Sequence, residues 1–364
     1  MVDVIILAGG YATRLRPLTF TKPKPLLPIL NKPALDWLLD LVAPVKPRSV
    51  YVSVRYMSEL IEKHINNKWT SRGLNVVVVK EDKPLGDGGP ISWINRLHGL
   101  DEEFIVINGD IFTNANIAEL LKAHRDNDAV ATVALTQVSD VSQYGVAVVD
   151  ERGLIREFVE KPEIGRAPSN LVNAGIYVFR RDALKYFPKP GEYAKIALDV
   201  LPRLIKDKLL YGYVIKGFWY DIGTVQSYID ANFRALDEYC PNSCMQGNAA
   251  NVKPPAYVGE GVSIGDGAEV GPYVVIMDNV KIGPYAKVRY SVVMDGVTIE
   301  RGAFVDYSVI GSDVFIGKWA RVERGVVIGD GTYVGDHVLI NRDCVVGPFR
   351  EVNQSIYEQG KILL

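Results

Sequence analysis

The sequence has few of the residues that carry metal or redox chemistry, with three cysteines and four histidines among 364 residues. Cys240 and Cys244 have neither a second cysteine pair nor a histidine nearby, so we expect ordinary thiols there rather than a metal site. An odd cysteine count is typical of a reducing compartment. No apolar run approaches the roughly 20 residues that cross a bilayer, and no secretory signal pattern opens the chain. We therefore expect a cytoplasmic protein without a membrane partner.

Neither sign of charge is in clear excess, because 41 Lys and Arg residues stand against 43 Asp and Glu residues and give a formal net charge of −2. Nothing in this balance points to a nucleic-acid partner. Hydrophobic residues make up 48% of the chain, which is ordinary for a globular protein, and the length suggests two domains.

The first 235 or so residues alternate strand-like and helix-like segments. Short, nearly continuous apolar runs lie at 2–7, 49–54, 74–79, 104–107 and 130–135, with helical patterns between them at 34–42, 58–65, 90–97 and 117–124. This alternation predicts a Rossmann-like α/β domain with a mostly parallel sheet. Further strands, some antiparallel, are expected at 146–149, 155–159, 172–179 and 209–215, followed by an amphipathic helix at 225–239. Ligands in such folds bind outside the carboxyl ends of the strands.

From about residue 251 an aliphatic residue recurs every six positions, with two steps of five. The series is Val258, Ile264, Val270, Ile276, Ile282, Val288, Met294, Ile299, Val305, Ile316, Val322, Ile328, Val334, Ile340 and Val346. A hexapeptide period predicts a left-handed parallel β-helix with about three hexads per coil. The five-residue steps suggest a residue deleted at a corner.

These patterns divide the chain into a catalytic domain at 1–240, a β-helix at 251–350 and a short tail at 351–364. A stacked prism with flat apolar faces invites self-association, so we expect a homo-oligomer formed through the β-helix.

The segment 7–28 follows the first predicted strand and carries the most specific pattern in the chain. Leu7, Ala8, Gly9 and Gly10 offer backbone N–H groups that can point at phosphate oxygens, and several cations follow them. The segment is not a Walker A loop, because no Gly-Lys-Ser/Thr follows, and it is not a G-x-G-x-x-G fingerprint, because the glycines are adjacent.

The whole string resembles the GGxGTRLxPxTxxxPKxLxP motif of the sugar-1-phosphate nucleotidyltransferases, with Ala12 in place of the usual Gly. The resemblance implies that a nucleoside triphosphate and a hexose 1-phosphate react to give a nucleotide sugar and pyrophosphate. In that reaction Arg14 would hold the leaving β- and γ-phosphates, and Lys24 would bridge the donor and acceptor phosphates. Lys22 and Arg16 are second choices for these roles.

Two aspartates follow predicted strands and are candidates for binding a metal ion. A single Asp in such a place is usually a turn or helix cap, but two of them accompany a phosphate loop here. Asp110 ends an Asn-Gly-Asp string and Asp221 lies in Trp-Tyr-Asp-Ile-Gly, which resemble the family's (G/N)-G-D and W-x-D-x-G elements. The resemblance implies that Asp110 and Asp221 together hold Mg²⁺ against the α-phosphate.

Three further strings resemble the family's sugar-binding elements. Glu160 and Lys161 match the E-K-P element, in which the Glu accepts hydrogen bonds from sugar hydroxyls and the Lys grips the sugar phosphate. Asn173 and Gly175 match the N-A-G element beneath the hexose ring, and Gly145 matches the Y-G-V segment, whose backbone approaches the sugar.

The choice of nucleobase depends on Glu81, which precedes a Pro-Leu-Gly string that ends in Gly86. A carboxylate only accepts hydrogen bonds, which suits the adjacent N1–H and N2–H₂ donors of guanine. The string resembles E-x-E-P-L-G-T-A-G-P of the mannose-1-phosphate guanylyltransferases, with Asp87 for Thr and Gly88 for Ala. This implies GTP and mannose 1-phosphate as substrates and GDP-mannose as product.

Two alternatives stay open from the sequence. One is a glucose-1-phosphate thymidylyl- or uridylyltransferase, and the other is a regulatory homologue without catalytic activity. An acyltransferase activity of the β-helix would need a general base such as His337, which is more simply interpreted as a polar turn residue.

Overall fold

A computed structural model describes residues 1–69, 73–163, 165–245 and 252–364. The chain forms two compact units. Unit 1 contains Met1–Gly10 and Ala34–Tyr220, and unit 2 contains Tyr11–Pro33 and Asp221–Leu364. The loop Tyr11–Pro33, which follows the first strand and carries several Lys and Arg residues, is therefore grouped with the C-terminal repeats. The sequence did not indicate this grouping. The domain boundaries expected from the sequence at 240, 251 and 350 stay a prediction, and residue 251 lies outside the described residues.

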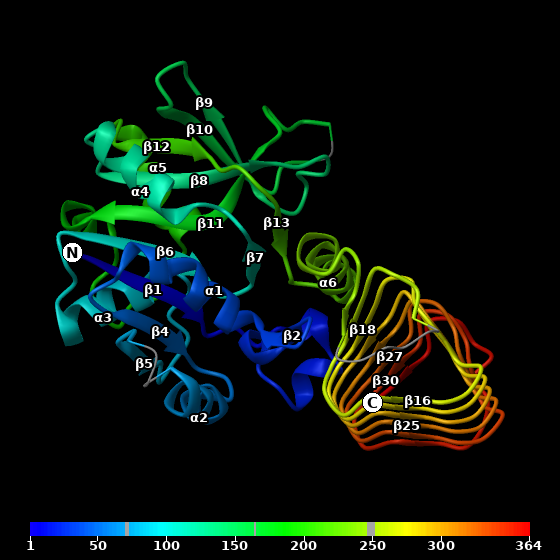
Figure 1. Ribbon diagram of the computed structural model, residues 1–364. Helices are drawn as coiled ribbons and strands as arrows, with labels where there is room; N and C mark the ends of the chain where they lie inside the picture. The colour runs from blue at the N-terminus through cyan, green and yellow to red at the C-terminus, as the bar shows by residue number, and fades with distance from the viewer. Residues whose placement is uncertain (70–72, 164, 246–251) are drawn as a thin grey trace. The chain divides into compact units, whose positions relative to one another are not determined.

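Unit 1 is built on parallel strands. β1 (Val2–Ala8) lies between β4 (Val50–Val54) and β6 (Glu103–Asn108), and β5 (Val76–Lys80) pairs with β4, all in parallel. Helices α1 (Ala34–Val42), α2 (Ser58–Lys68), α3 (Gly89–His98) and α4 (Ile117–Asp126) flank these strands (Figure 1). The mostly parallel α/β sheet predicted from the sequence is confirmed, and the expected helix at 34–42 matches α1.

The rest of the sheet is mainly antiparallel. β11 (Leu171–Arg180) pairs antiparallel with β6 and with β8 (Ala131–Gln137), while β12 (Leu210–Val214) runs parallel to β8. β9 (Gly145–Val149) and β10 (Ile155–Glu160) form an antiparallel pair. The sequence did not predict the short elements β7 (Ile111–Thr113), α5 (Leu201–Lys206) and β13 (Trp219–Asp221). β7 and β13 form a separate two-stranded sheet.

Strand direction brings the predicted site segments to one edge of the sheet. The carboxyl ends of β1, β4, β5 and β6 share an edge because these strands are parallel. β11 is antiparallel to β6, and Ile176 lies opposite Ile107, so the amino-terminal half of β11 reaches the same edge.

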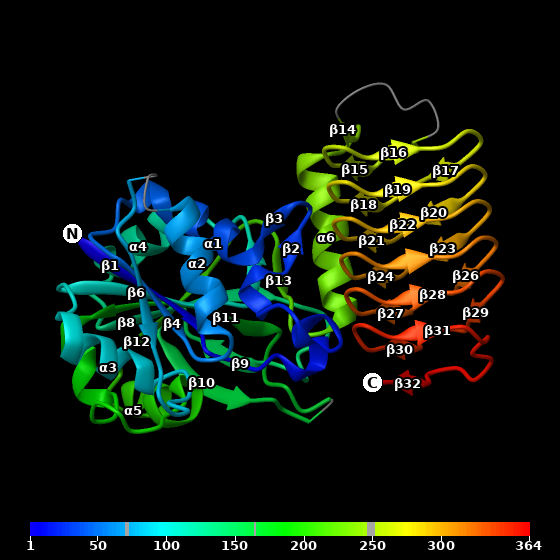
Figure 2. The ribbon, with the colours of Figure 1, turned by 90° about the horizontal axis from the view of Figure 1, so that it is seen from below.

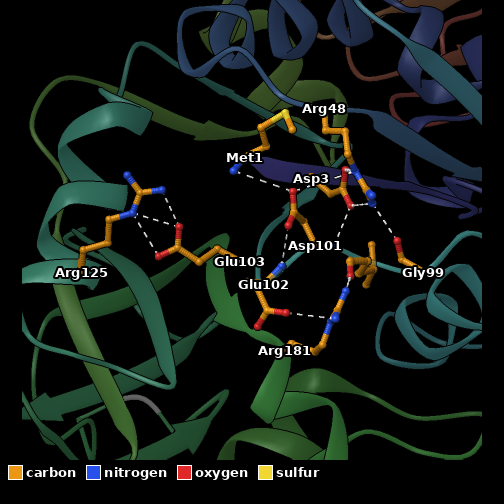
Figure 3. A network of polar contacts seen from close by, with 10 residues as sticks. Met1, Asp3, Arg48, Gly99, Asp101, Glu102, Glu103, Arg125 and Arg181 are labelled. Carbon is orange, nitrogen blue, oxygen red and sulfur yellow. Dashed lines mark hydrogen bonds and ion pairs between the residues drawn. The ribbon is translucent and has the colours of Figure 1, made fainter.

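Charged side chains stabilise the opposite edge, where β1 and β6 begin (Figure 3). Asp3 is fully buried and accepts hydrogen bonds from Arg48 Nε at 3.0 Å and from the Asp101 backbone N–H at 2.9 Å. Arg125 of α4 pairs with Glu103 of β6, and its Nε lies 2.9 and 3.0 Å from the two carboxylate oxygens. A buried carboxylate is stable only when paired, so this network fixes the starts of both central strands.

A second buried carboxylate joins α1 to α2. Asp36 on α1 accepts hydrogen bonds from Lys68 Nζ at 2.7 Å and Trp69 Nε1 at 2.6 Å, and its Oδ1 lies 2.8 Å from His64 Nε2. Burial by itself would raise the pKa of Asp36, but these hydrogen bonds outweigh it and lower the pKa to about 2.

Unit 2 contains short parallel strands that stack into the coils of a β-helix (Figure 2). One face is formed by β14 (Cys244–Met245), β15 (Ala256–Val258), β18 (Val274–Ile276), β21 (Val292–Val293), β24 (Val309–Ile310), β27 (Val327–Ile328), β30 (Val345–Val346) and β32 (Ile362–Leu363). A second face is formed by β16 (Ser263–Ile264), β19 (Lys281–Ile282), β22 (Thr298–Ile299), β25 (Phe315–Ile316), β28 (Tyr333–Val334) and β31 (Glu351–Val352). The third face is formed by β17 (Glu269–Val270), β20 (Lys287–Arg289), β23 (Phe304–Asp306), β26 (Arg321–Val322) and β29 (Leu339–Ile340). These stacked sheets are consistent with the predicted left-handed β-helix.

The strand register corrects one member of the hexapeptide series. Ile276 stacks on Val293, which in turn stacks on Ile310, so Val293 and not Met294 occupies the inward column. Ile276 follows its stacking partner Val258 by 18 residues, whereas Val293 follows Ile276 by 17. The shorter coil moves the inward position back by one residue.

α6 (Val225–Tyr239) has the bounds predicted from the sequence and begins with a capping box between Thr224 and Ser227. The expectation of ordinary thiols at its end was wrong, because Cys240 and Cys244 form a disulfide that links α6 to β14. Two cysteines four positions apart can close only a very small loop, and the sequence alone gave no reason to pair them. Cys344 is a buried free thiol.

No helix in the described ranges is both long enough and apolar enough to cross a lipid bilayer.

A buried histidine on α4 makes stability depend on pH. His124 is 1% exposed, its Nδ1 lies 2.8 Å from Thr132 Oγ1, and burial lowers its pKa to about 4. The unfolded chain takes up this proton near pH 6.5, so stability is complete above that pH and falls as the pH decreases toward 4. We expect the free energy of unfolding to drop by about 2 kcal/mol between pH 7.5 and pH 5 on account of His124.

Urea unfolding of the wild type and His124→Gln across this range isolates the histidine. Asp36 does not interfere, because its pKa change between 3.8 and about 2 lies below the window. Equal pH slopes of the unfolding free energy for the two proteins between pH 6.5 and 5 would contradict the prediction.

Candidate active site

The carboxyl ends of β1 and β6 approach each other closely at the predicted phosphate loop. The Gly109 backbone N–H donates to the Leu7 carbonyl at 2.8 Å, and a Cβ at Gly109 would lie 2.6 Å from that oxygen. Only glycine fits there, so Asp110 is held beside the end of β1 by the backbone itself. Ala8 and Gly9 come directly after Leu7 in the chain, and a Cβ placed at Gly10 would meet no atom within 4 Å.

Glu81 lies immediately against this glycine turn. It follows β5 and is 9% exposed, and its Oε1 accepts a hydrogen bond from Ser53 Oγ of β4 at 2.8 Å. A Cβ at Gly9 would lie 2.8 Å from the same Oε1. Burial raises the pKa of Glu81, and hydrogen bonds from Ser53 and the Leu85 backbone oppose the shift. A carboxylate offers about four acceptor positions, so capacity for a ligand donor remains.

The segment after Glu81 is tied to residues 194–196. Gly86 has a φ of +73° and packs so tightly that a Cβ would lie 2.1 Å from the Ala194 carbonyl oxygen. Asp87 Oδ1 accepts a hydrogen bond from the Ile196 backbone N–H at 2.6 Å, and burial raises the pKa of Asp87. The residue that departs from the family's Thr is thus a structural acceptor.

The predicted sugar residues Gly145 and Glu160 lie opposite each other on β9 and β10. A Cβ at Gly145 would lie 2.8 Å from Glu160 Oε2 and 2.3 Å from the Phe158 ring. Lys161 follows with a φ of +47°, and its N–H donates to the Tyr144 carbonyl at 3.0 Å. This local geometry holds the carboxylate of Glu160 over the Gly145 backbone.

Asn173 and Gly175 shape an irregularity in β11, where the register with β8 shifts. Asn173 Nδ2 donates to Tyr177 Oη at 2.6 Å, and Asn173 Oδ1 accepts from the Gly175 N–H at 2.9 Å. Gly175 has a φ of +70°, and a Cβ there would lie 2.6 Å from Asn108 Nδ2. Both ends of the Asn173 amide therefore hold the bulge, and its contact with a sugar stays a prediction.

Sequence reasoning missed Tyr177 and Trp219. Burial raises the pKa of Tyr177, and the nearby negative charges of Asp87, Glu160 and Asp110 add to the shift. The hydrogen bond that the Tyr177 hydroxyl accepts from Asn173 opposes this shift of the pKa. Trp219 Nε1 donates to the Ala174 carbonyl at 2.8 Å, which supports the same bulge from β13. Tyr177 sits within an apolar strand, so nothing in its sequence context distinguishes it from a core residue.

Three of the predicted site residues, Arg14, Lys24 and Asp221, lie in unit 2. A Cβ at Gly223 would lie 2.9 Å from Asp221 Oδ1 and 3.2 Å from Arg14 Nη2, so this carboxylate and guanidinium flank the same glycine. Arg14 lies in the 3₁₀ turn Thr13–Leu15, and Lys24 begins the 3₁₀ turn Lys24–Leu26. Ala12 precedes the first turn with a φ of +48°, which explains why the family's motif has Gly there.

Asp110 belongs to unit 1 and Asp221 to unit 2, and each is described within its own unit, so their joint binding of a metal ion stays a prediction. Among the described residues no group of three or more His, Cys, Asp or Glu side chains could hold a metal ion. Mg²⁺ commonly uses one or two carboxylates and completes its shell with phosphate oxygens and water, so a pair of aspartates suits it.

Comparison with known proteins assigns the chain to a family. The family model described as nucleotidyl transferase matches residues 3–238, and the one described as GMPPB C-terminal domain matches residues 252–362. The chain therefore belongs to the nucleotidyl transferase family, as the resemblance predicted.

Its curated relatives cover the full length. A putative mannose-1-phosphate guanyltransferase of Sulfolobus acidocaldarius is 43% identical over 100% of both chains. The mannose-1-phosphate guanylyltransferase catalytic subunit beta of Drosophila melanogaster is 33% identical over 99% of this chain and 96% of its own.

Among solved structures, HddC from Yersinia pseudotuberculosis complexed with GMP-PN is 27% identical, with a TM-score of 0.55 over 64% of this chain and 99% of its own. A putative glucose-1-phosphate thymidylyltransferase from Bacillus anthracis is 24% identical, with a TM-score of 0.59 over 68% and 98% of the two chains, and it supports the fold alone.

The bulge in β11 gives a prediction with a matched control. Gly175→Ala places a Cβ at a positive φ and against Asn108, whereas Gly153→Ala has a similar φ of +79° with its nearest neighbour at 3.5 Å. Both changes should cost about 1–2 kcal/mol for the left-handed backbone. Gly175→Ala should lower the free energy of unfolding, measured in urea, by more than Gly153→Ala does, because its Cβ also meets Asn108. It should also raise the KM for the sugar phosphate. Equal losses for the two variants would contradict the close packing on Asn108.

Proposed function

We propose that this protein transfers the guanylyl group of GTP to mannose 1-phosphate and releases GDP-mannose and pyrophosphate. The observation that carries the choice of base is Glu81, a carboxylate held against the Gly9 backbone at the end of β5. The full-length relatives named for this activity support the same choice of substrates.

The reaction needs no enzyme nucleophile, because the acceptor phosphate is already an anion. A phosphate oxygen of the sugar attacks the α-phosphorus in line, and the bond from that phosphorus to the bridging oxygen of the β-phosphate breaks. Pyrophosphate leaves with the electron pair. The chief obstacle is repulsion between two anions, which fixed cations and positioning offset.

The roles of the cations follow from this charge problem. Arg14 binds the β- and γ-phosphates that leave, Lys24 bridges donor and acceptor phosphates, and Lys161 grips the sugar phosphate. Backbone N–H groups of residues 7–10 bind the nucleotide, with Gly86 beside the base. Glu160 accepts hydrogen bonds from sugar hydroxyls above Gly145, with Asn173 and Gly175 beneath the ring.

Asp110 and Asp221 would hold Mg²⁺, and their hard oxygen donors fit that ion. When bound, the ion supplies positive charge that offsets the charge of the reacting phosphates. Asp110 is kept in place for this task by the bond between Gly109 and Leu7.

We also propose a homo-oligomer formed through the β-helix and a cytoplasmic location, where nucleoside triphosphates are available. The β-helix exposes large aromatic side chains, among them Trp319 and Phe349, which are 52% and 73% exposed. Exposed aromatic residues of this kind are typical of association surfaces. His337 is exposed at a corner with a φ of +59°, as expected of a turn residue.

Replacing Asp110 tests the enzymatic assignment. Asp110→Asn should lower kcat by about 100-fold or more at saturating Mg²⁺, because a neutral amide is a poor ligand for a hard cation. Thermal unfolding should stay unchanged. The control Asp128→Asn removes an exposed carboxylate of the same unit and should have normal activity. A near-normal kcat for Asp110→Asn would refute its role.

The choice of base is tested by comparing GTP, ITP, UTP and dTTP. ITP lacks the 2-amino group, so wild type should prefer GTP to ITP and to the pyrimidine nucleotides. Glu81→Gln should lower kcat/KM for GTP by roughly 10- to 100-fold, the range expected for a lost bidentate contact, and should narrow the ratio of GTP to ITP. Ser53→Ala, which keeps the carboxylate, should retain the preference for GTP.

Pyrophosphate release measures all of these reactions. A wild-type preference for UTP or dTTP would favour a uridylyl- or thymidylyltransferase. A lack of activity with every pair of nucleotide and sugar phosphate would favour a regulatory homologue.

A further inference from the structure

One edge of the β-helix carries a column of polar residues at equivalent positions of successive coils. We call Asp278, Asp295, Ser312 and Asp330 the acidic column, and the strand registers stack its members in this order. Asp330 Oδ1 accepts the Ser312 N–H at 2.8 Å, and Asp278 Oδ1 accepts the Glu260 N–H at 2.8 Å. Each of these carboxylates thus uses one oxygen to tie its own coil to the coil before it.

The acidic column also binds the segment of residues 21–31, which follows the first strand and carries Lys22 and Lys24. At one end Asp330 Oδ2 accepts hydrogen bonds from Thr21 Oγ1 at 2.8 Å and from Lys22 Nζ at 2.9 Å. Lys22 Nζ also donates to Ser312 Oγ at 2.7 Å. This ion pair is mostly shielded from water, with the Lys22 and Asp330 side chains 29% and 13% exposed. Such shielding makes the pair stronger than one on an open surface.

At the other end, Asn31 Nδ2 donates to Asp278 Oδ1 at 2.9 Å. Between the two ends, burial raises the pKa of Asp295, and the positive charge of Lys22 opposes that shift. Segment 21–31 therefore runs along the acidic column from Asp330 to Asp278.

α6 holds the same segment from a second direction. The Leu30 backbone N–H donates to Asn232 Oδ1 at 2.8 Å, and Tyr228 Oη donates to the Pro28 carbonyl at 2.5 Å. Asn232 and Tyr228 are both fully buried. The short strand β2 (Pro28–Ile29) of this segment lies beside α6 in Figures 1 and 2, and it pairs with β3 (Lys32–Pro33).

Lys24 lies between these two sets of anchors. The turn that it begins is closed by a hydrogen bond from the Leu27 N–H to the Lys24 carbonyl at 3.0 Å, and the flanking Pro23 and Pro25 are buried. A cation on a segment fixed at both ends loses little freedom when it meets a phosphate, and such positioning lowers an activation barrier.

We propose that the acidic column is a positioning element of the transfer reaction, which fixes segment 21–31 and thereby Lys24. Lys22 is the tether of that segment and not a substrate ligand. The inference rests on the proposed function, and it gives the β-helix a direct part in turnover besides self-association.

The test uses the full chain and a matched control. Asp330→Asn keeps an oxygen for the Ser312 N–H and removes the charge that binds Lys22. Asp336→Asn makes the same change at a corner where the carboxylate accepts the Lys318 N–H at 2.8 Å and forms no bond to the loop. The two carboxylates are packed alike, because a Cβ at Gly311 would lie 2.6 Å from Asp330 Oδ1 and a Cβ at Gly317 would lie 2.6 Å from Asp336 Oδ1.

We expect Asp330→Asn and Lys22→Met each to lower kcat about tenfold with less than a twofold change in the KM for GTP, while Asp336→Asn matches wild type. The double variant should be no slower than the slower single variant, because both changes break one tether. A raised KM for GTP in Lys22→Met with additive losses would show that Lys22 binds substrate. Equal kcat values for Asp330→Asn and Asp336→Asn would overturn the proposal.

Amide hydrogen exchange separates a failure of this inference from a failure of the proposed function, because it needs no substrate. The N–H groups of Leu26, Leu27 and Leu30 are hydrogen bonded within the segment or to α6. They should exchange faster in Asp330→Asn than in Asp336→Asn, at unchanged thermal stability. If the tether loosens in this way and wild type turns over no substrate pair, the activity is misassigned. Unchanged exchange would overturn the tether itself.

Discussion

The hydrogen bond from the Gly109 N–H to the Leu7 carbonyl is the contact on which the site in unit 1 depends. It joins the ends of the two central parallel strands at a distance that only a glycine allows. The glycine turn after β1 then continues on one side of this contact and Asp110 on the other. Gly9 against Glu81 and Gly175 against Asn108 repeat the same solution, in which a missing side chain lets a polar group come close. At this edge of the sheet, close backbone contacts at glycines fix where the polar side chains lie.

Much of the fold could be predicted from the sequence because its signals are periodic. Buried parallel strands give apolar runs, and α6 gives an amphipathic pattern of fifteen residues, so these elements matched within a few positions. β7 and β13 escaped notice because three residues are too few for a period. Met294 was wrong by one place, since coils of 17 and 18 residues produce the same local pattern. The disulfide at Cys240 was missed because pairing depends on the path of the chain.

The site was predicted by motif, and its supporting residues were not. Charged and glycine residues at fixed spacings predict Glu81, Glu160 and Gly175 as site residues, and the structure gives each of them a tightly packed neighbour. Tyr177, Trp219 and Asp87 each hold another residue in place by a hydrogen bond. The partners of Trp219 and Asp87 lie far from them in the sequence, and Tyr177 lies within an apolar strand, so no local pattern marks these contacts. Asn173 illustrates the limit of a motif, because its amide is used within β11. Nor could the sequence indicate that the loop after β1 groups with the C-terminal coils, since no local pattern encodes a tertiary contact.

Because segment 21–31 is anchored at both Asp278 and Asp330, the spacing of the β-helix coils sets the distance that this segment must span. Asp278 and Asp330 are separated by three coil steps, which at about 4.8 Å each amount to roughly 14 Å. The nine positions from Lys22 to Asn31 must match that span. Insertion of one repeat between these coils would therefore stretch or detach the loop, whereas repeats added beyond Asp330 would leave it untouched. Variation in the number of coils among homologues should thus be confined to coils outside the span from Asp278 to Asp330.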